Sequence, residues 1–260
     1  MNRRPSRRTV LKTGAAAAGL TAAAAATPGW IRPEQAGAAP RGRLVYVFLR
    51  GGQDHLSTVI PYTEAAYFDA RPTIAIPASS VLRLDDRFGL HPAMTGLHAL
   101  HSAGRLGVVV GAGNLAGNRS HFTAQDLCEY GATSRPTDAK GWLARYLSST
   151  ATSNDSLFRG VAMTGTVPMS LRGYNALGIP GIRGFGLNTA TRPIASLIKD
   201  QYGGSAPVER TGVQAISASS RLSTLTGSTA GDSTARAFAD LAILLASNLG
   251  IEVLCREVDE

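Results

Sequence analysis

The sequence predicts an α/β fold whose central sheet is mainly parallel. Three runs of strand-forming apolar residues alternate with helical stretches that carry apolar side chains on one face. This alternation is typical of parallel strands joined by helices, and such connections are almost always right-handed. The strand-like runs are residues 44–49, 106–110 and 251–255, and the two clearest helices are residues 93–103 and 233–248.

Residues 1–38 resemble a twin-arginine export signal, with its features in the usual order. The pair Arg7-Arg8 follows a serine, and an alanine-rich stretch covers residues 13–26. Ala36-Gly37-Ala38 has the small-x-small pattern that signal peptidases cleave. Because the twin-arginine export machinery reads such a signal and carries folded proteins, we expect a periplasmic or extracellular protein. The alternative is a disordered basic tail.

The rest of the chain, residues 39–260, is long enough for one domain with a substantial core. The net charge of +8 belongs mostly to residues 1–38, whose six basic residues and one acidic residue leave +3 for the remainder. No cluster of basic and aromatic residues follows, so nucleic acid is not an expected partner. Residues 13–26 are too short and too weakly apolar for a stable membrane span.

The first half of residues 39–260 predicts a strand, a helix and a second strand. Residues 44–49 form an unbroken apolar run that predicts a strand buried on both faces, ending at Arg50-Gly51-Gly52. Residues 93–103 have apolar side chains at helical spacing and stop at a glycine, which predicts a helix packed on a sheet. Residues 106–110 predict a second buried strand, and residues 111–118 a glycine-rich loop.

The next segment predicts a well-capped helix followed by shorter elements. Ser120 is a suitable N-cap for a helix over residues 121–130, which Gly131 can end in a left-handed conformation. The segments that follow predict a helix at residues 142–148, a strand at 160–163 and loops over 164–188.

The C-terminal segment predicts a helix and a strand after a weakly patterned stretch. Residues 205–232 are mostly Ser, Thr, Gly and Ala, which predicts a mobile, partly helical segment. Ser233 is the expected cap of a helix through Asn248, which Gly250 ends. The side chains expected on one side of this helix are Phe238, Leu241, Leu245 and Leu249, and residues 251–255 predict the next strand.

The two cysteines could pair after export to an oxidising compartment. However, Cys255 shares a strand face with Ile251 and Val253, which favours a buried thiol over a disulfide with Cys128. The chain has no Cys-x-Pro-x-Arg segment, as in a typical sulfatase, and no Gly-x-Ser-x-Gly elbow or phosphate-binding P-loop.

Polar residues that could bind a metal or take part in catalysis follow the first predicted strand. Asp54 offers a hard oxygen ligand for a divalent metal, and Ser57 and Thr58 supply hydroxyls close by. Gly51 and Gly52 let the backbone turn sharply and approach a ligand. In the alternative interpretation, Asp54 caps the turn that follows it.

A second polar cluster follows residues 106–110. His121 is a candidate metal ligand, and Arg119 could hold an oxygen of a phosphate or sulfate group. In the structural alternative, Ser120 caps a helix and His121 is simply its first residue. His98 and His101 share a helix face but lack a third ligand, so we assign them to the surface or the edge of the core.

Several motifs together resemble the domain-of-unknown-function 1501 family. After the twin-arginine signal they are LVYVFLRGGQDHLSTVIP at residues 44–61, RPTIAIP at 71–77, FGLHPA at 88–93 and RSHFTAQ at 119–125. Their order and spacing match over residues 43–131, and more loosely beyond them.

The resemblance implies an alkaline-phosphatase-like domain with three α/β/α layers. Active members of that superfamily hydrolyse phosphate or sulfate esters with divalent metals. By this resemblance Asp54 matches the metal-binding aspartate after the first strand, Ser57 or Thr58 lies near the expected nucleophile, and His121 sits in the family's Ser-His-Phe motif. In the hydrolase that this implies, Arg119 would steady the anionic ester substrate. In this sequence His55 replaces the glycine that usually follows the aspartate, and no position matches the superfamily nucleophile convincingly.

Members of the family continue into a Gly-Trp-Asp-Thr-His segment after the strand corresponding to residues 251–258. We therefore expect the domain at residues 39–260 to be incomplete at its C-terminus. The sequence leaves three functional hypotheses, which are a metal-dependent ester hydrolase in its full-length form, a non-catalytic secreted binding protein of the same fold, and an inactive fragment.

Overall fold

The structure is a computed structural model that describes residues 42–114, 117, 119–150, 154, 156–183, 185, 200, 207–229 and 231–258. The predicted export signal lies outside the described residues. Within the remaining chain, contacts define two compact units. One contains Asp54–Ala112, and the other contains Pro40–Gln53 together with Gly113–Glu260.

The second unit is built on a four-stranded sheet in the order β1-β7-β5-β6. All three strand pairs are parallel, as the alternation of strands and helices predicted. In the longest pair, Leu44 to Leu49 align with Val253 to Val258. The strands are β1 (Leu44–Leu49), β7 (Val253–Val258), β5 (Gly160–Ala162) and β6 (Leu177–Gly178).

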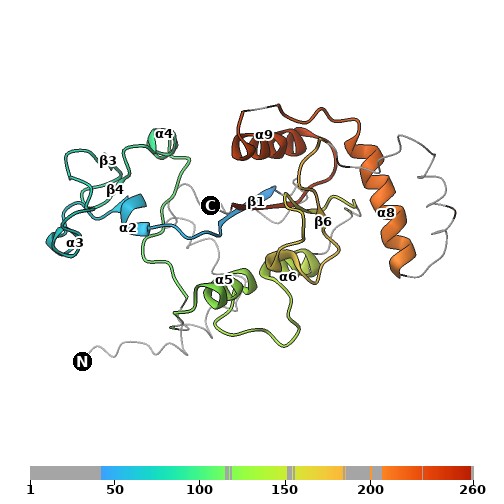
Figure 1. The fold of residues 1–260 in the computed structure, drawn as a ribbon, viewed down its shortest axis with the longest axis horizontal. Helices are drawn as coiled ribbons and strands as arrows, with labels where there is room; N and C mark the ends of the chain where they lie inside the picture. The colour runs from blue at the N-terminus through green and yellow to red at the C-terminus, as the bar shows by residue number, and fades with distance from the viewer. Residues whose placement is uncertain are drawn as a thin grey trace, which may run out of the picture. The chain divides into compact units, whose positions relative to one another are not determined.

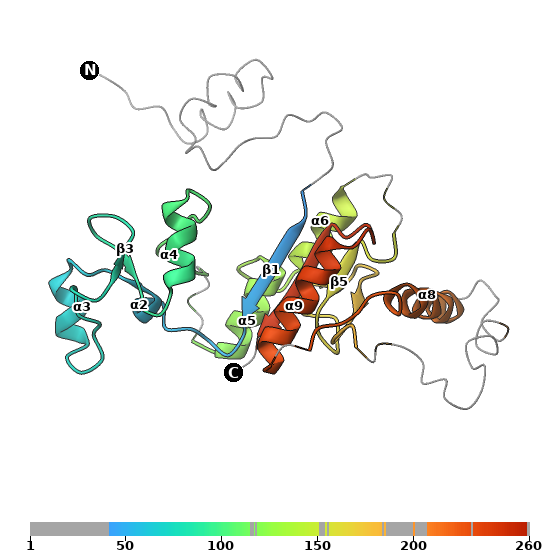
Figure 2. The same ribbon diagram turned by 90° about the horizontal axis from the view of Figure 1, so that it is seen from above.

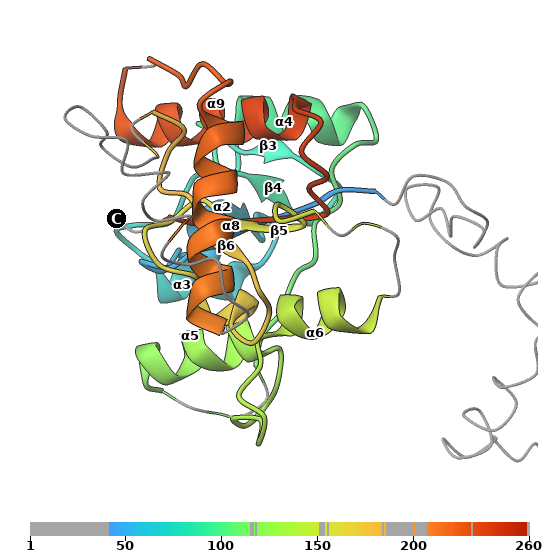
Figure 3. The same ribbon diagram turned by 90° about the vertical axis from the view of Figure 1, so that its right-hand side faces the viewer.

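Helices cover both faces of this parallel sheet, which establishes a mixed α/β architecture (Figures 1 and 3). Side chains of α8 (Pro207–Leu222) and α9 (Ser233–Ala246) join the apolar cluster on one face. Side chains of α6 (Trp142–Ser149) join the cluster on the other face, where α5 (His121–Tyr130) lies beside α6. The short helix η2 (Met169–Leu171) contacts both α5 and α6.

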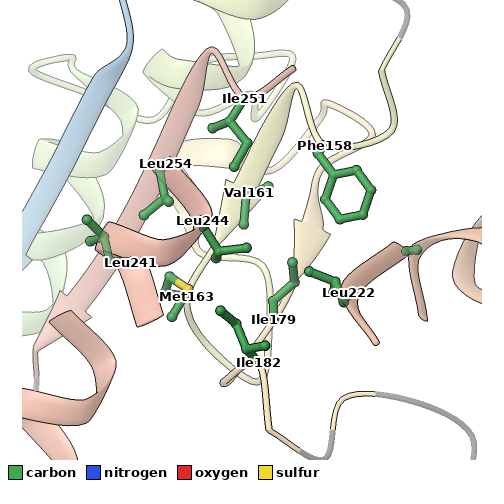
Figure 4. Close-up of a cluster of buried hydrophobic side chains, with 11 residues drawn as sticks. Phe158, Val161, Met163, Ile179, Ile182, Leu222, Leu241, Leu244, Ile251 and Leu254 are labelled. Atoms are coloured by element: carbon green, nitrogen blue, oxygen red, sulfur yellow. The ribbon is translucent and has the colours of Figure 1, made fainter. Parts of the chain in front are cut away.

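The larger apolar core lies between the sheet and helices α8 and α9 (Figure 4). Leu244 of α9 meets Val161 of β5 and Leu254 of β7, and Leu222 closes the core from α8. These four side chains are at most 1% exposed. Burying an aliphatic side chain of this size contributes about 1.5–3 kcal/mol, so this core is a main source of stability for the unit.

The first unit carries a small antiparallel sheet in the order β2-β4-β3. Its strands are β2 (Val59–Ile60), β3 (Leu82–Arg83) and β4 (Gly89–Leu90), and its helices are α2 (His55–Thr58), α3 (Ala65–Ala70) and α4 (Thr95–Ser102). Helices α3 and α4 lie at opposite ends of the small sheet (Figure 2). Its apolar core consists of Ile60, Tyr62, Tyr67 and Val81.

Two strand predictions are wrong. Residues 106–110 form no strand, and Val109 and Val110 are 76% and 53% exposed. An apolar run becomes a strand only when another strand satisfies its hydrogen bonds, and none does so in the described part of the chain. Residues 44–49 are a strand but are not buried on both faces, since Leu44, Val47 and Leu49 are 37%, 39% and 45% exposed. Among the described strands, β1 lies at the edge of the sheet.

The predicted helices are largely confirmed, with corrections to α8 and α9. Helix α5 has its predicted boundaries, and the side chain of Ser120 accepts a hydrogen bond from the backbone of Thr123. Helix α8 is a regular helix of 16 residues inside the segment predicted to be only partly helical. Helix α9 is capped by Asp232 rather than Ser233 and ends at Ala246. Its buried apolar residues are Ala237, Leu241 and Leu244, whereas Phe238 is 39% exposed.

Candidate functional site

Asp54 is the N-cap of helix α2, as the structural alternative predicted. Its Oδ1 accepts a hydrogen bond from the backbone N–H of Leu56 at 3.1 Å, and its Oδ2 accepts one from the hydroxyl of Ser57 at 2.7 Å. The hydroxyl of Thr58 donates to the backbone carbonyl of Asp54 at 2.9 Å. The structure therefore brings three of the predicted site residues together, around a single turn in the first unit.

The principal partner of Asp54 is Arg71, which was not among the site residues predicted from the sequence. Its two terminal nitrogens, Nη1 and Nη2, each donate to one carboxylate oxygen at 2.7 Å. Nη1 also donates to the Ser57 hydroxyl at 3.2 Å. The Arg71 guanidinium and then the Ser57 hydroxyl hold the pKa of Asp54 well below its usual range. Arg71 opens the RPTIAIP motif, but its distance from Asp54 along the chain gave no signal of the contact.

The predicted metal ligand His121 lies beside the turn that follows β1, within the second unit. Gly52 has a φ of +91°, and a Cβ added there would lie 3.6 Å from Cε1 of His121. Nε2 of Gln125 lies 2.8 Å from Nε2 of His121 and donates to the backbone carbonyl of Arg50. Gln125 thus connects the histidine to the end of β1. Gly52, just after β1, and His121, at the start of α5, therefore lie next to each other.

Further along helix α5, the buried carboxylate of Glu129 contacts Arg50 at the end of β1. His121, Gln125 and Glu129 are spaced four residues apart and share one helix face. The Glu129 side chain is fully buried, and its Oε2 accepts from Nη1 of Arg50 at 3.0 Å. The same Nη1 is 2.7 Å from Oε1 of Glu257 on β7. Arg50, which directly follows β1, therefore pairs with one carboxylate from α5 and with one from the neighbouring strand β7.

Burial raises the pKa of Glu129 above its usual value. A hydrogen bond from the backbone N–H of Ser170 at 3.0 Å and the pairing with Arg50 oppose this rise. Glu129 was not among the site residues predicted from the sequence. Its spacing of four residues from Gln125, which places both on one helix face, was the signal that could have indicated it. Because Glu129 on α5 pairs with Arg50 at the end of β1 and accepts from Ser170 of η2, it joins the helix to the sheet and to η2.

Cys255 is a buried free thiol, as favoured from the sequence, and Cys128 is free and exposed. Burial raises the pKa of Cys255 to about 12. Its Sγ lies 3.6 Å from the hydroxyl of Ser170. A thiol with this pKa stays protonated at neutral pH and is a poor nucleophile.

The remaining expectations concern an anion and a metal. Arg119, the predicted anion-holding residue, is exposed in the second unit. The described residues contain no group of three or more His, Cys, Asp or Glu side chains arranged to hold a metal ion. A metal at Asp54 would face the guanidinium of Arg71, which already occupies both carboxylate oxygens. The contacts of Asp54 therefore do not fit a bound cation.

Comparison with protein-family models, with curated proteins and with solved structures gave no significant match to this chain. Among the helices in the described ranges, none combines the length and the apolarity that a membrane span requires.

Proposed function

We propose that the protein is exported by the twin-arginine machinery and acts outside the cytoplasm as a non-catalytic binding protein with an alkaline-phosphatase-like fold. The motifs shared with the domain-of-unknown-function 1501 family support the fold, and the parallel sheet with helices on both faces is compatible with it. The export signal of residues 1–38 supports the location.

One observation carries the non-catalytic assignment, namely the occupation of the Asp54 carboxylate by Arg71. A nucleophilic serine is activated by a neighbouring base or by a coordinated metal ion. Arg71 occupies both carboxylate oxygens of Asp54, which leaves neither oxygen free to bind a metal. The only described carboxylate that accepts from Ser57 is Asp54, and its lowered pKa makes it a weak base. Ser57 and Thr58 instead complete the hydrogen bonds of the turn at the start of α2.

A metal-dependent phosphate or sulfate ester hydrolase is the second candidate. It is favoured by the position of His121 next to the Gly52 turn at the carboxyl end of β1, since open parallel α/β sheets bind ligands at that edge. In this candidate Ser57, Thr58 or water would attack the ester. The pairing of Asp54 with Arg71 is the contact that such an enzyme would have to break.

An assay for ester hydrolysis separates the two candidates. The exported protein would be incubated with aryl phosphate and aryl sulfate esters and with Mn²⁺, Zn²⁺ or Ca²⁺ in turn. The binding protein predicts no hydrolysis above the buffer rate with any metal. Turnover that is lost in Ser57→Ala or Thr58→Ala, but kept in the matched control Ser80→Ala, would replace it with the hydrolase.

The export step is tested separately by replacing the twin arginines. Changing both Arg7 and Arg8 to Lys should leave uncleaved protein in the cytoplasm. The same change at Arg3 and Arg4, which lie outside the motif, should leave export intact. Equal export of both variants would contradict the signal assignment.

A further inference from the structure

A pocket rich in arginine lies at the carboxyl ends of β6 and β7, next to the start of helix α9. Its volume is about 620 Å³, which lies within the range of small-molecule sites. It is lined by Pro180 and Gly181 after β6, by Arg256 of β7, by Ser233, Arg236, Ala237 and Asp240 of α9, and by Arg183 and Thr229. All of these residues belong to the second unit. We call this site the arginine pocket.

The arginine pocket carries a net positive charge. Arg183, Arg236 and Arg256 line it, and Asp240 is the single acidic residue in the lining. The Asp240 carboxylate accepts hydrogen bonds from the backbone N–H groups of Ile182 at 3.0 Å and Ser228 at 2.6 Å. Asp240 is 2% exposed and fixes the two lining loops, and its single negative charge leaves the three arginines in excess.

Two of the arginines are held in place by specific contacts. Arg236 donates to the backbone carbonyl of Gly231 at 3.2 Å. The stem of Arg183 packs against Gly227, where a Cβ would collide with it. Asp232 already caps α9 through a hydrogen bond from Ala235. The arginines, and not the helix terminus, therefore supply the positive charge.

Arg256 has unused hydrogen-bonding capacity beside the pocket. Its Nη1 donates to the backbone carbonyl of Met163, whereas its buried Nε has no hydrogen-bond partner among the described residues. A buried donor without an acceptor is costly. An oxyanion offers several acceptor oxygens and matches the planar fork of a guanidinium group.

We propose that the arginine pocket binds a small molecule through a phosphate or sulfate group. The lining holds three arginines and one aspartate, which gives the pocket its positive charge. The pocket is larger than a phosphate or sulfate ion, so an organic ester fills it better than the free ion does. This inference rests on the pocket residues alone. It does not depend on whether the Asp54 turn is catalytic, so the two proposals can fail separately.

Binding is measured by titration calorimetry with inorganic phosphate, inorganic sulfate and an aryl phosphate ester. We expect at least one probe to bind, and Arg236→Gln and Arg183→Gln each to weaken it roughly tenfold or more, because each removes charge-assisted hydrogen bonds. Arg221→Gln is the matched control, since Arg221 lines a different pocket near Ser156 and Asn248. Its affinity should equal that of the unaltered protein.

A second measurement avoids dependence on variants that fold poorly. Arginine modification by phenylglyoxal is followed by mass spectrometry with and without the best-binding probe. The probe should protect Arg183, Arg236 and Arg256 and leave Arg221 unprotected. The proposal is overturned if no probe binds, if the Arg221 variant loses affinity equally, or if protection falls outside the arginine pocket.

Discussion

Arg71 binds both carboxylate oxygens of Asp54, with Nη1 and Nη2 each at 2.7 Å. Asp54, which was predicted to be a metal ligand, is instead the N-cap of helix α2, and Arg71 holds its carboxylate in place. The Asp54 side chain is 44% exposed, so solvent screens the pair, but its bidentate geometry and the Ser57 hydroxyl keep the carboxylate ionised. The pair is the basis of the first prediction.

Replacing Arg71 with Gln should reduce the dependence of stability on acid pH. The pKa of Asp54 is lowered in the folded protein, so its stabilisation is present above the unfolded value of about 3.9 and is lost as the pH falls toward the folded value. Urea unfolding between about pH 2 and 6 should therefore show that the free energy of unfolding falls less steeply with decreasing pH in Arg71→Gln than in the unaltered protein. The exposed pair of Arg87 with Glu64 gives the control, and a pH dependence altered as much in Arg87→Gln would contradict the prediction.

Gly52→Ala should destabilise the protein by about 1–2 kcal/mol, because Gly52 has a φ of +91° that a residue with a Cβ adopts only under strain. The added methyl group would also sit against His121. Gly42→Ala is the matched control, since nothing lies within 4 Å of its added Cβ. Equal unfolding free energies for the two variants would show that the turn tolerates the change.

Glu129→Ala should cost about 2 kcal/mol, because it leaves the buried N–H of Ser170 without its acceptor and removes one partner of Arg50. Asp126→Ala, a partly buried acid on the same helix, should change the unfolding free energy little. The two proteins would be compared by urea denaturation at neutral pH.

The same substitution predicts a specific pH effect. Burial raises the folded pKa of Glu129, so its contribution is most favourable below the unfolded pKa of about 4.3 and declines as the pH rises through the folded pKa. The destabilisation of Glu129→Ala, relative to the unaltered protein, should therefore shrink from acid to neutral pH. A difference that grows with pH would contradict the assignment.

Thiol labelling should distinguish the two cysteines. Cys128 is exposed and should react quickly with a thiol reagent, whereas Cys255 is fully buried and its pKa is raised to about 12. One fast thiol is expected in the native protein and two in denaturant. Cys128→Ser should remove the fast reaction, and a fast reaction that survives in that variant would show that Cys255 is accessible.

Local signals predicted the helices better than the strands. Ser120 and Gly131 bound α5 as expected, because a cap depends on residues within one turn. The run at 106–110 has the composition of a strand, but strand formation depends on a partner that the run itself does not specify. The same limit applies to β1, because the burial of a strand's faces depends on the elements that cover them and not on its own sequence alone.

The candidate site was predictable in its residues but not in its pairing. Asp54, Ser57 and Thr58 do come together, because they lie within one turn of the chain. Arg71 is 17 residues away from Asp54, and that contact depends on the packing of the first unit. The arginine pocket gathers residues from β7, α9 and two loops, so no local pattern could indicate it.

Thermal melting with and without metal tests the central claim, that Arg71 holds Asp54 as part of the fold. The purified protein would be melted alone and with Mn²⁺, Zn²⁺ or Ca²⁺, since a ligand of the native state must raise its stability. We predict the same Tm in every case. A metal-dependent rise in Tm that disappears in Asp54→Asn would contradict the claim and identify Asp54 as a metal ligand.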